Sequence, residues 1–254
     1  MIVRNISIKR EIFEREKTIV KKFFNLNKIP EIPDWIMEEK INHWNKNLFH
    51  LHYLPKISLD EELNFPLWKR KNDKPHKVFY KKIREGELPK EAKILTGKWI
   101  LIDGRNKPKK RVPWIRINDV RFLEKLGFHP KNFFKQWGKQ IHQDEYLGDI
   151  LAKKGFGSRF CLNIQEIESL KPFILDFLKI NSEKNIRLPF FIEYNYLANT
   201  FYSQWRKTET WEWFEDKLQN GQYLAGGSKS AGCLGWEPPQ FWSTILTFRP
   251  VLEL

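Results

Sequence analysis

Leu95-Thr-Gly-Lys-Trp-Ile-Leu-Ile-Asp103 decides the fold, because it carries the clearest strand pattern in the first half of the chain. A short, continuous apolar run bounded by turn residues is typical of a β-strand with a buried centre. A second strand pattern, Phe248-Arg-Pro-Val-Leu-Glu-Leu254, lies far from it in sequence. Helical patterns occupy much of the chain around and between these two runs. We therefore expect an α+β fold with short antiparallel strands and flanking helices.

Several segments carry helical patterns. Ile8 to Phe24 is charged and amphipathic, and Asn163-Ile-Gln-Glu166 is a capping box that opens a second helix. Pro189 suits the first position of a third helix, which runs to Asn199. Thr208 to Leu218 predicts a fourth helix or helical turn, closed by the Asn-Gly pair that follows it.

The composition is that of a folded protein with a large aromatic core. The chain has 254 residues, of which 41% are apolar, 15% aromatic and 30% charged. Only Cys161 and Cys233 are present, which excludes a disulfide scaffold. The sequence lacks the long apolar run of a membrane helix and the apolar stretch of a secretion signal. We therefore expect a cytoplasmic protein with no membrane partner.

Positive charge is concentrated in the middle of the chain. The net charge is +14, and the stretch from Lys69 to Arg116 contributes +12 of it, whereas residues 201–254 carry −1. Lys107-Pro-Lys-Lys-Arg111 resembles a nucleic-acid or phosphate patch. Three tryptophans in or beside the stretch are candidate stacking partners: Trp68, Trp99 and Trp114. Two interpretations stay open, a nucleic-acid-binding module at residues 69–116 and a solvated lysine-rich surface.

Sequence motifs of catalysis are missing. Neither a phosphate-binding loop, a nucleophile elbow, a zinc-protease motif nor a paired Cys-x-x-Cys occurs. His142-Gln-Asp-Glu145 groups a base with two carboxylates, but closeness in sequence does not establish a site, and we interpret it as a solvated turn. His50 and His52 flank Leu51 in a predicted strand without nearby Cys or Asp, which favours packed or surface histidines. The sequence predicts no catalytic residues, no metal and no cofactor.

Aromatic residues gather in the final third of the chain. Thirteen lie between Tyr194 and Phe248, and several of these should form the core. Trp211, Trp213 and Phe214 are expected to be buried at helical spacing. Trp236, Phe241 and Trp242 instead lie in a proline-containing stretch with small polar residues. Aromatic anchors mixed with adaptable polar groups are typical of a binding surface.

Several motifs of this region resemble the variable proteins of diversity-generating retroelements. They are Arg187-Leu-Pro189, Glu193-Tyr-Asn-Tyr-Leu-Ala-Asn199, Trp205, Thr210-Trp-Glu-Trp-Phe214, Leu224-Ala-Gly-Gly227, Gly232-Cys-Leu234 and Phe248-Arg-Pro250. The resemblance covers about residues 95–254 and implies a C-type-lectin-like domain related to formylglycine-generating enzymes. Residues 1–94 add little to it, and their own pattern predicts a basic, mostly helical region. Those enzymes use a closely placed cysteine pair, which this sequence lacks, so a catalytic version is disfavoured.

The resemblance also implies how such a protein works. An error-prone reverse transcriptase rewrites adenines in the 3′ end of the gene, so that surface side chains change while the scaffold is retained. The expected product is a non-enzymatic protein that binds a protein or other macromolecular ligand. The residues expected to form its variable surface are Ser228, Lys229, Ser230, Trp236, Glu237, Gln240, Phe241, Trp242, Ser243 and Thr244.

A variable segment needs a fixed frame beneath it. Glycines at the turns, an aromatic core and a terminal strand would supply that frame, and we expect Lys98–Ile102 to pair with Phe248–Leu252. Gly226, Gly227, Leu234, Phe248 and Arg249 would belong to the scaffold. Arg249 is expected to form a buried ion pair or backbone hydrogen bonds and not to contact ligand.

Overall fold

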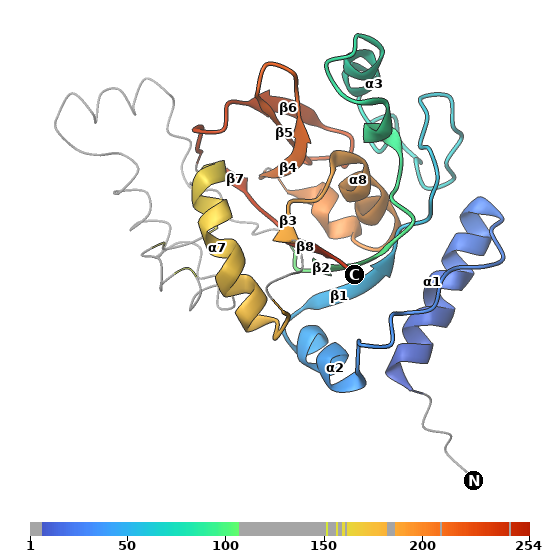
Figure 1. Cartoon of the computed structure of the whole chain (residues 1–254). Helices are drawn as coiled ribbons and strands as arrows, with labels where there is room; N and C mark the ends of the chain where they lie inside the picture. The colour runs from blue at the N-terminus through green and yellow to red at the C-terminus, as the bar shows by residue number, and fades with distance from the viewer. Residues whose placement is uncertain are drawn as a thin grey trace.

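The computed structural model describes residues 7–106, 151, 156, 159–160, 162–181, 186–208, 210–243 and 245–254. It is a mixed α+β structure with two small sheets (Figure 1). The elements in chain order are α1 (Ile8–Phe24), α2 (Glu38–Lys46), β1 (Phe49–Tyr53), α3 (Lys77–Arg84), η1 (Lys90–Lys93), β2 (Trp99–Asp103), α7 (Ile164–Phe177), β3 (Ile186–Arg187), α8 (Phe191–Thr200), η2 (Ser203–Lys207), β4 (Trp211–Lys217), β5 (Tyr223–Gly226), β6 (Leu234–Glu237), β7 (Leu246–Thr247) and β8 (Val251–Glu253).

The first sheet joins strands from distant parts of the sequence. Its order is β1-β2-β8-β3, and all of its pairs are antiparallel. Leu101 lies opposite Leu252 and Ile102 opposite Val251, which confirms the predicted pairing of the two deciding runs. β1 comes from the region before residue 95, so the two predicted parts of the chain share one sheet.

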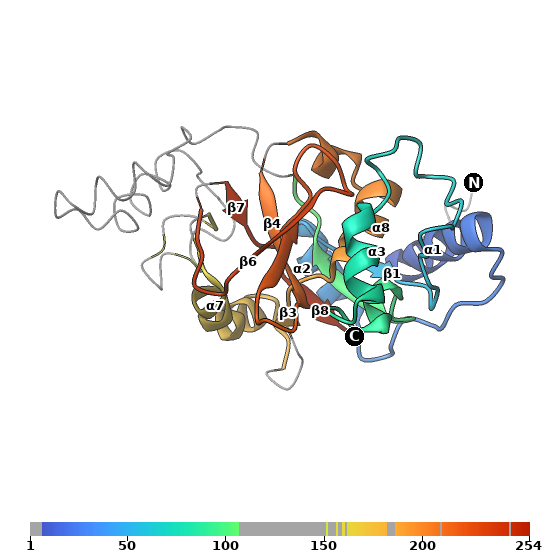
Figure 2. The same ribbon diagram turned by 90° about the horizontal axis from the view of Figure 1, so that it is seen from above.

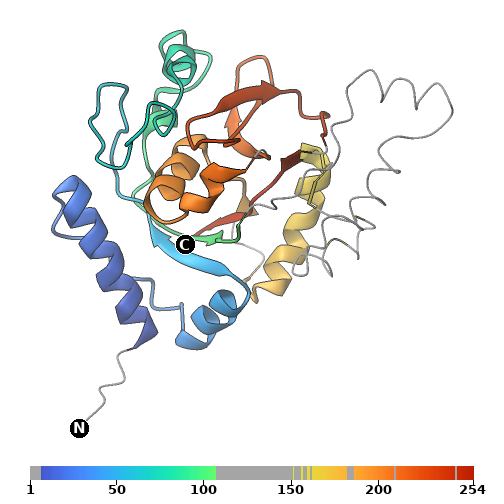
Figure 3. The same ribbon diagram turned by 180° about the vertical axis from the view of Figure 1, so that it is seen from behind.

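Helices cover both faces of this sheet. All five residues of β2 are buried, and the four apolar ones alternate between two apolar clusters. Trp99 and Leu101 pack with residues of α1, α2 and α7, whereas Ile100 and Ile102 pack with α8. Figure 3 shows α1 and α2 on one side of β1 and α8 on the other. A strand buried on both faces needs this continuous apolar sequence.

The second sheet has the order β6-β5-β4-β7, with β4 and β7 parallel and the other pairs antiparallel. Figure 2 shows it between α7 on one side and α3 and α8 on the other. β6 is an edge strand, so Trp236 lies on a strand and not in the irregular stretch that the sequence indicated.

The helix predicted over residues 208–218 is wrong, because this segment contains β4. Trp213 and Phe214 are adjacent and both fully buried, but they enter different apolar clusters. Successive side chains point to opposite faces only in an extended strand. Trp211 is half-buried, which also corrects the expectation that all three aromatic residues are core.

The other predicted helices are present. α1 has the predicted bounds, and α7 begins with the capping box of Asn163 and Glu166. α8 starts at Phe191, so Pro189 lies just before the N-cap and not at the first helical position. Phe191 through Asn199 are all buried, because α8 lies between the two sheets (Figure 1). None of the described helices has both the length and the apolar character that crossing a membrane requires.

Candidate functional site

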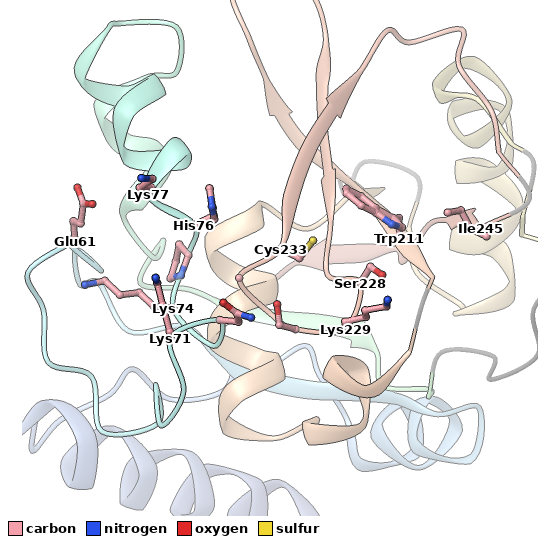
Figure 4. Close-up of a pocket in the computed structure, with 14 residues that line it drawn as sticks. Glu61, Lys71, Lys74, His76, Lys77, Trp211, Ser228, Lys229, Cys233 and Ile245 are labelled. Carbon is pink, nitrogen blue, oxygen red and sulfur yellow. The ribbon is translucent and has the colours of Figure 1, made fainter. Parts of the chain in front are cut away.

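A cavity of about 1040 Å³ lies between the loop that precedes α3 and the turn that joins β5 to β6. Figure 4 shows Lys71, Lys74 and Lys77 at one end of it, and Trp211 and Ile245 at the other. Ser228, Lys229, Ser230 and Cys233 of the turn line the cavity as well. Part of the predicted basic stretch and part of the predicted variable surface therefore meet in one place.

Backbone hydrogen bonds hold the two walls of the cavity together. The Gly232 N–H donates to the Asn72 carbonyl (3.0 Å), and the His76 N–H donates to the Gly232 carbonyl (3.1 Å). A Cβ atom at Gly232 would lie 1.8 Å from the Lys74 carbonyl oxygen. Only glycine permits this close approach of two backbones.

Side chains of α8 support both walls from below. The Asn195 side-chain amide donates to the carbonyls of Asp73 (2.9 Å) and Ala231 (3.0 Å), and its oxygen accepts from the Trp68 indole N–H (3.0 Å). The Asn199 amide also donates to the Asp73 carbonyl (3.0 Å). Both asparagines are buried, so these bonds fix the loop and the turn relative to α8.

The buried carboxylate of Asp73 stabilises the loop before α3 through two ion pairs. It is 1% exposed and pairs with Arg70 at 3.1 Å and with Arg206 at 3.2 Å. Sequence reasoning missed Asp73 and the two asparagines. The available signal was the pair of asparagines, four residues apart and thus on one face of a predicted apolar helix.

The lining of the cavity is strongly basic. The lining contains four lysines and one acidic residue, Glu61. The Glu61 carboxylate pairs with Arg84 at 2.6 Å. Neighbouring Lys81 and Lys82 have acidic partners, Glu85 at 3.6 Å and Glu87 at 2.6 Å. In the described part of the chain, Lys71, Lys74 and Lys77 form no such ion pair. Lys74 instead places its ammonium 5.5 Å from the centre of the Trp68 ring.

The predicted variable residues fall into three groups. Ser228 and Ser230 are each 7% exposed and face the cavity, with exposed Lys229 between them. Trp236 and Glu237 are half-buried on the edge strand β6. Gln240 is exposed in the segment that follows, in which Phe241, Trp242 and Ser243 are half-buried. Thr244 lies outside the described residues.

These groups do not converge on one point. Trp236 packs on the α8 side, 5.0 Å from the Lys82 ammonium, and Phe241 packs against the other apolar cluster. The Ile164 N–H donates to the Pro239 carbonyl (3.0 Å), which places the last group beside the start of α7. The structure therefore distributes the predicted surface along residues 228–243 and brings only its first three residues to the cavity.

Arg249 is fully buried, as the sequence predicted, and it makes both of the expected kinds of contact. Its guanidinium donates to both carboxylate oxygens of Glu212 (2.8 and 3.0 Å) and to the carbonyls of Asp103 and Arg105. Its Cζ lies 3.8 Å from the centre of the Trp205 ring, which stacks in turn on Tyr202 at 4.1 Å. This cluster ties β8, β4 and β2 into one rigid frame.

One of the three predicted stacking tryptophans needs correction. Trp99 is 2% exposed and donates its indole N–H to the Pro30 carbonyl (2.9 Å), so its ring cannot stack on a base. Trp68 is half-buried and hydrogen-bonded to Asn195. Trp114, the Lys107–Arg111 cluster, His142–Glu145 and Cys161 lie outside the described residues.

His50 and His52 belong to a separate cluster. Both rings hydrogen-bond to the Tyr202 hydroxyl, at 2.9 and 2.6 Å, and His52 also bonds to the buried carboxylate of Glu16 at 3.0 Å. Burial, together with the neighbouring His52 and Arg15, lowers the pKa of His50 to about 4. Among the described residues, no three side chains of His, Cys, Asp or Glu are grouped to hold a metal ion.

No protein-family model, curated protein or solved structure matches this chain. The geometry of the site consists of a basic cavity with Trp211 at one end and a segment with three half-buried aromatic residues, Trp236, Phe241 and Trp242.

Proposed function

We propose that this protein is a non-enzymatic ligand-binding protein whose C-terminal surface is hypervariable and is diversified by a retroelement, on a C-type-lectin-like frame. The observation that carries the proposal is the intermediate burial of Trp236, Phe241 and Trp242. Each keeps part of its surface accessible, although most of the aromatic residues around them are core. Large aromatic groups left partly exposed near polar side chains are typical of binding surfaces.

The frame beneath this surface supports the proposal. Four side chains of this frame are fully buried: Trp205 of the 3-10 helix η2, Trp213 and Phe214 of β4, and Arg249 between β7 and β8. A core of this kind positions the backbone without help from the side chains that would vary.

The edge strand offers a second reason why the surface would tolerate change. β6 pairs with β5 from Leu234 to Glu237 through backbone groups, which are available whatever side chain residue 236 carries. Its other edge has no partner strand within the described residues. A paired backbone with an accessible face can therefore carry different side chains.

The DNA beside the gene tests the retroelement. We expect a reverse-transcriptase gene and a near-repeat of the codons for residues 228–244 that differs from them at adenines. Sequencing the locus and comparing the two copies makes the test. A locus with neither a reverse transcriptase nor a near-repeat would remove the retroelement from the proposal.

Nucleic-acid binding through residues 69–116 is the second candidate function. The observation in its favour is that Lys71, Lys74 and Lys77 gather around one cavity without acidic partners in the described structure. Such binding should weaken steeply as salt rises, because each neutralised phosphate releases counterions. Affinity for single-stranded DNA that is independent of salt would exclude it.

A further inference from the structure

The cavity combines two chemistries at opposite ends. Lys71, Lys74 and Lys77 supply positive charge at one end, and the indole of Trp211 supplies an aromatic wall at the other (Figure 4). Ser228 and Ser230 also line the cavity. A ligand that fills such a space needs an anionic part and an aromatic or apolar part.

Two serines of the turn add hydrogen-bonding groups to the lining. Ser228 and Ser230 are each 7% exposed, and both residues line the cavity. A serine hydroxyl can donate a hydrogen bond to an oxyanion within reach. The two serines therefore suit an anionic ligand, as the lysines do.

Among the described residues, the acidic groups of the cavity wall pair with arginines and not with Lys71, Lys74 or Lys77. Glu61 is committed to Arg84, and Asp73 is buried behind the loop with Arg70 and Arg206. The N-terminus of α3 also faces the cavity through His76 and Lys77, and it adds the positive end of the helix dipole. An anion with several charges suits this end better than a single carboxylate.

The site is held in place before any ligand arrives. Gly232 joins the loop that precedes α3 to the turn between β5 and β6 by two backbone hydrogen bonds. Asn195 of α8 donates hydrogen bonds to both segments. A preorganised site loses little conformational entropy on binding. The cavity volume of about 1040 Å³ accommodates a compact ligand with several phosphates.

We propose that this cavity binds a small ligand that carries phosphate groups on an aromatic body, the chemistry of a nucleoside polyphosphate. The phosphates would lie among Lys71, Lys74, Lys77 and the two serine hydroxyls, and the aromatic body would lie against Trp211. This ligand class deepens the proposed function and rests on it, because Ser228, Lys229 and Ser230 belong to the predicted variable surface.

Calorimetric titration with adenosine triphosphate, inorganic triphosphate and adenosine tests the assignment on the full-length chain. We expect saturable binding of adenosine triphosphate, weaker binding of inorganic triphosphate, and the weakest binding of adenosine. The variant K71Q/K74Q/K77Q should lose about tenfold or more in affinity for both phosphate ligands, since three charge-assisted contacts are removed. The variant W211L should bind adenosine triphosphate more weakly than wild type and bind inorganic triphosphate with unchanged affinity.

A matched control separates the cavity from general positive charge. The variant K28Q/K46Q/K90Q removes the same charge from exposed positions away from the cavity, and it should change either affinity by less than about twofold. Circular dichroism checks that both triple variants are folded. Equal losses in the two triple variants would overturn the assignment, as would tighter binding of an acidic peptide than of adenosine triphosphate.

Two further outcomes would overturn it. One is the absence of saturable binding by either phosphate ligand to the wild-type chain. The other is binding of a short thymidine oligonucleotide that both triple variants weaken equally, which would indicate diffuse backbone contacts. The proposed function is tested by different measurements, namely the adenine-specific repeat in the DNA and the tolerance of residues 236–243 to substitution. Failure of the phosphate site can therefore be distinguished from failure of the proposed function.

Discussion

Arg249 shows how one side chain fixes the path of a chain segment. Its guanidinium is fully buried, engages both oxygens of Glu212 and stacks against Trp205. A buried charge is tolerated only when it is paired and hydrogen-bonded, so the surrounding backbone has few alternative arrangements. The segment after β7 is thereby fixed to β4, the neighbour of β5.

Replacing Arg249 by Met should therefore strongly destabilise the fold. The change leaves the Glu212 carboxylate buried without its partner, and we expect the free energy of unfolding to fall by about 3–5 kcal/mol. Arg84→Met is the matched control, because the pair it breaks with Glu61 is largely exposed and should contribute less than about 1 kcal/mol. Urea unfolding of both variants measures the difference. Similar losses in the two variants would show that Arg249 does not hold the frame.

Asp216 makes stability depend on pH. Burial raises the pKa of its carboxyl from 3.8 to about 7 in the folded protein. Between these values the unfolded chain ionises at this position while the folded chain keeps its proton, so Asp216 reduces the stability as pH rises from about 4 to about 7.

Asp216→Asn removes that dependence and keeps an acceptor for the Phe191 N–H. Relative to wild type, the variant should gain stability steadily from about pH 4 to about pH 7 and then level off. The histidines contribute equally to the pH dependence of both proteins, so their effect cancels in the difference in stability between variant and wild type. Chemical denaturation at a series of pH values measures it, and a difference that stays flat over this range would show that Asp216 is ionised in the fold.

At the scale of elements, the sequence predicts strands and helices well where one local pattern acts alone. The apolar run of β2, the amphipathic α1 and the capping box of α7 are all correct, as is the β2–β8 pairing. β4 was misread, because Trp211, Trp213 and Phe214 fit helical spacing and strand alternation alike. Contacts between distant residues, which a local pattern does not contain, made it a strand.

The candidate site was predictable only in pieces. The basic stretch and the serine turn were both identified, but their meeting depends on Asn195, Asp73 and Gly232, which bring residues 70–76 beside residues 228–233. Such convergence is a tertiary property. The stacking role expected for Trp99 is wrong for the same reason, since its burial follows from packing in the apolar cluster that it shares with α1, α2 and α7.

Gly232→Ala tests the contact between the loop and the turn. The new Cβ would clash with the Lys74 carbonyl, so we expect a loss of about 2 kcal/mol or more as the two walls separate. Gly221→Ala is the matched control. It has φ +85° and an open surrounding, and it should cost only about 1 kcal/mol. Thermal unfolding ranks the two variants, and a loss at Gly232 no larger than at Gly221 would show that the walls are not tightly joined.

At the scale of the whole molecule, the chain folds around two apolar clusters that share the first sheet. Residues from before and after position 95 enter both clusters, and the early region supplies β1 and the lysine wall of the cavity. Within residues 228–243, Lys229 and Gln240 are exposed, whereas Trp236, Phe241, Trp242 and Ser243 are half-buried. Our proposal requires a separation between these accessible side chains and the buried core, so that variation leaves the core intact.

Two matched libraries test this separation most directly. One randomises Trp236, Gln240, Phe241, Trp242 and Ser243, and the other randomises Trp205, Trp213, Phe214 and Phe248. The measurement is the fraction of members that resist proteolysis. We predict that most members of the first library stay folded, at a typical cost of about 1 kcal/mol per substitution, whereas most of the second unfold, at about 3 kcal/mol or more. Equal loss of folded members in both libraries would contradict an exchangeable surface on a fixed frame.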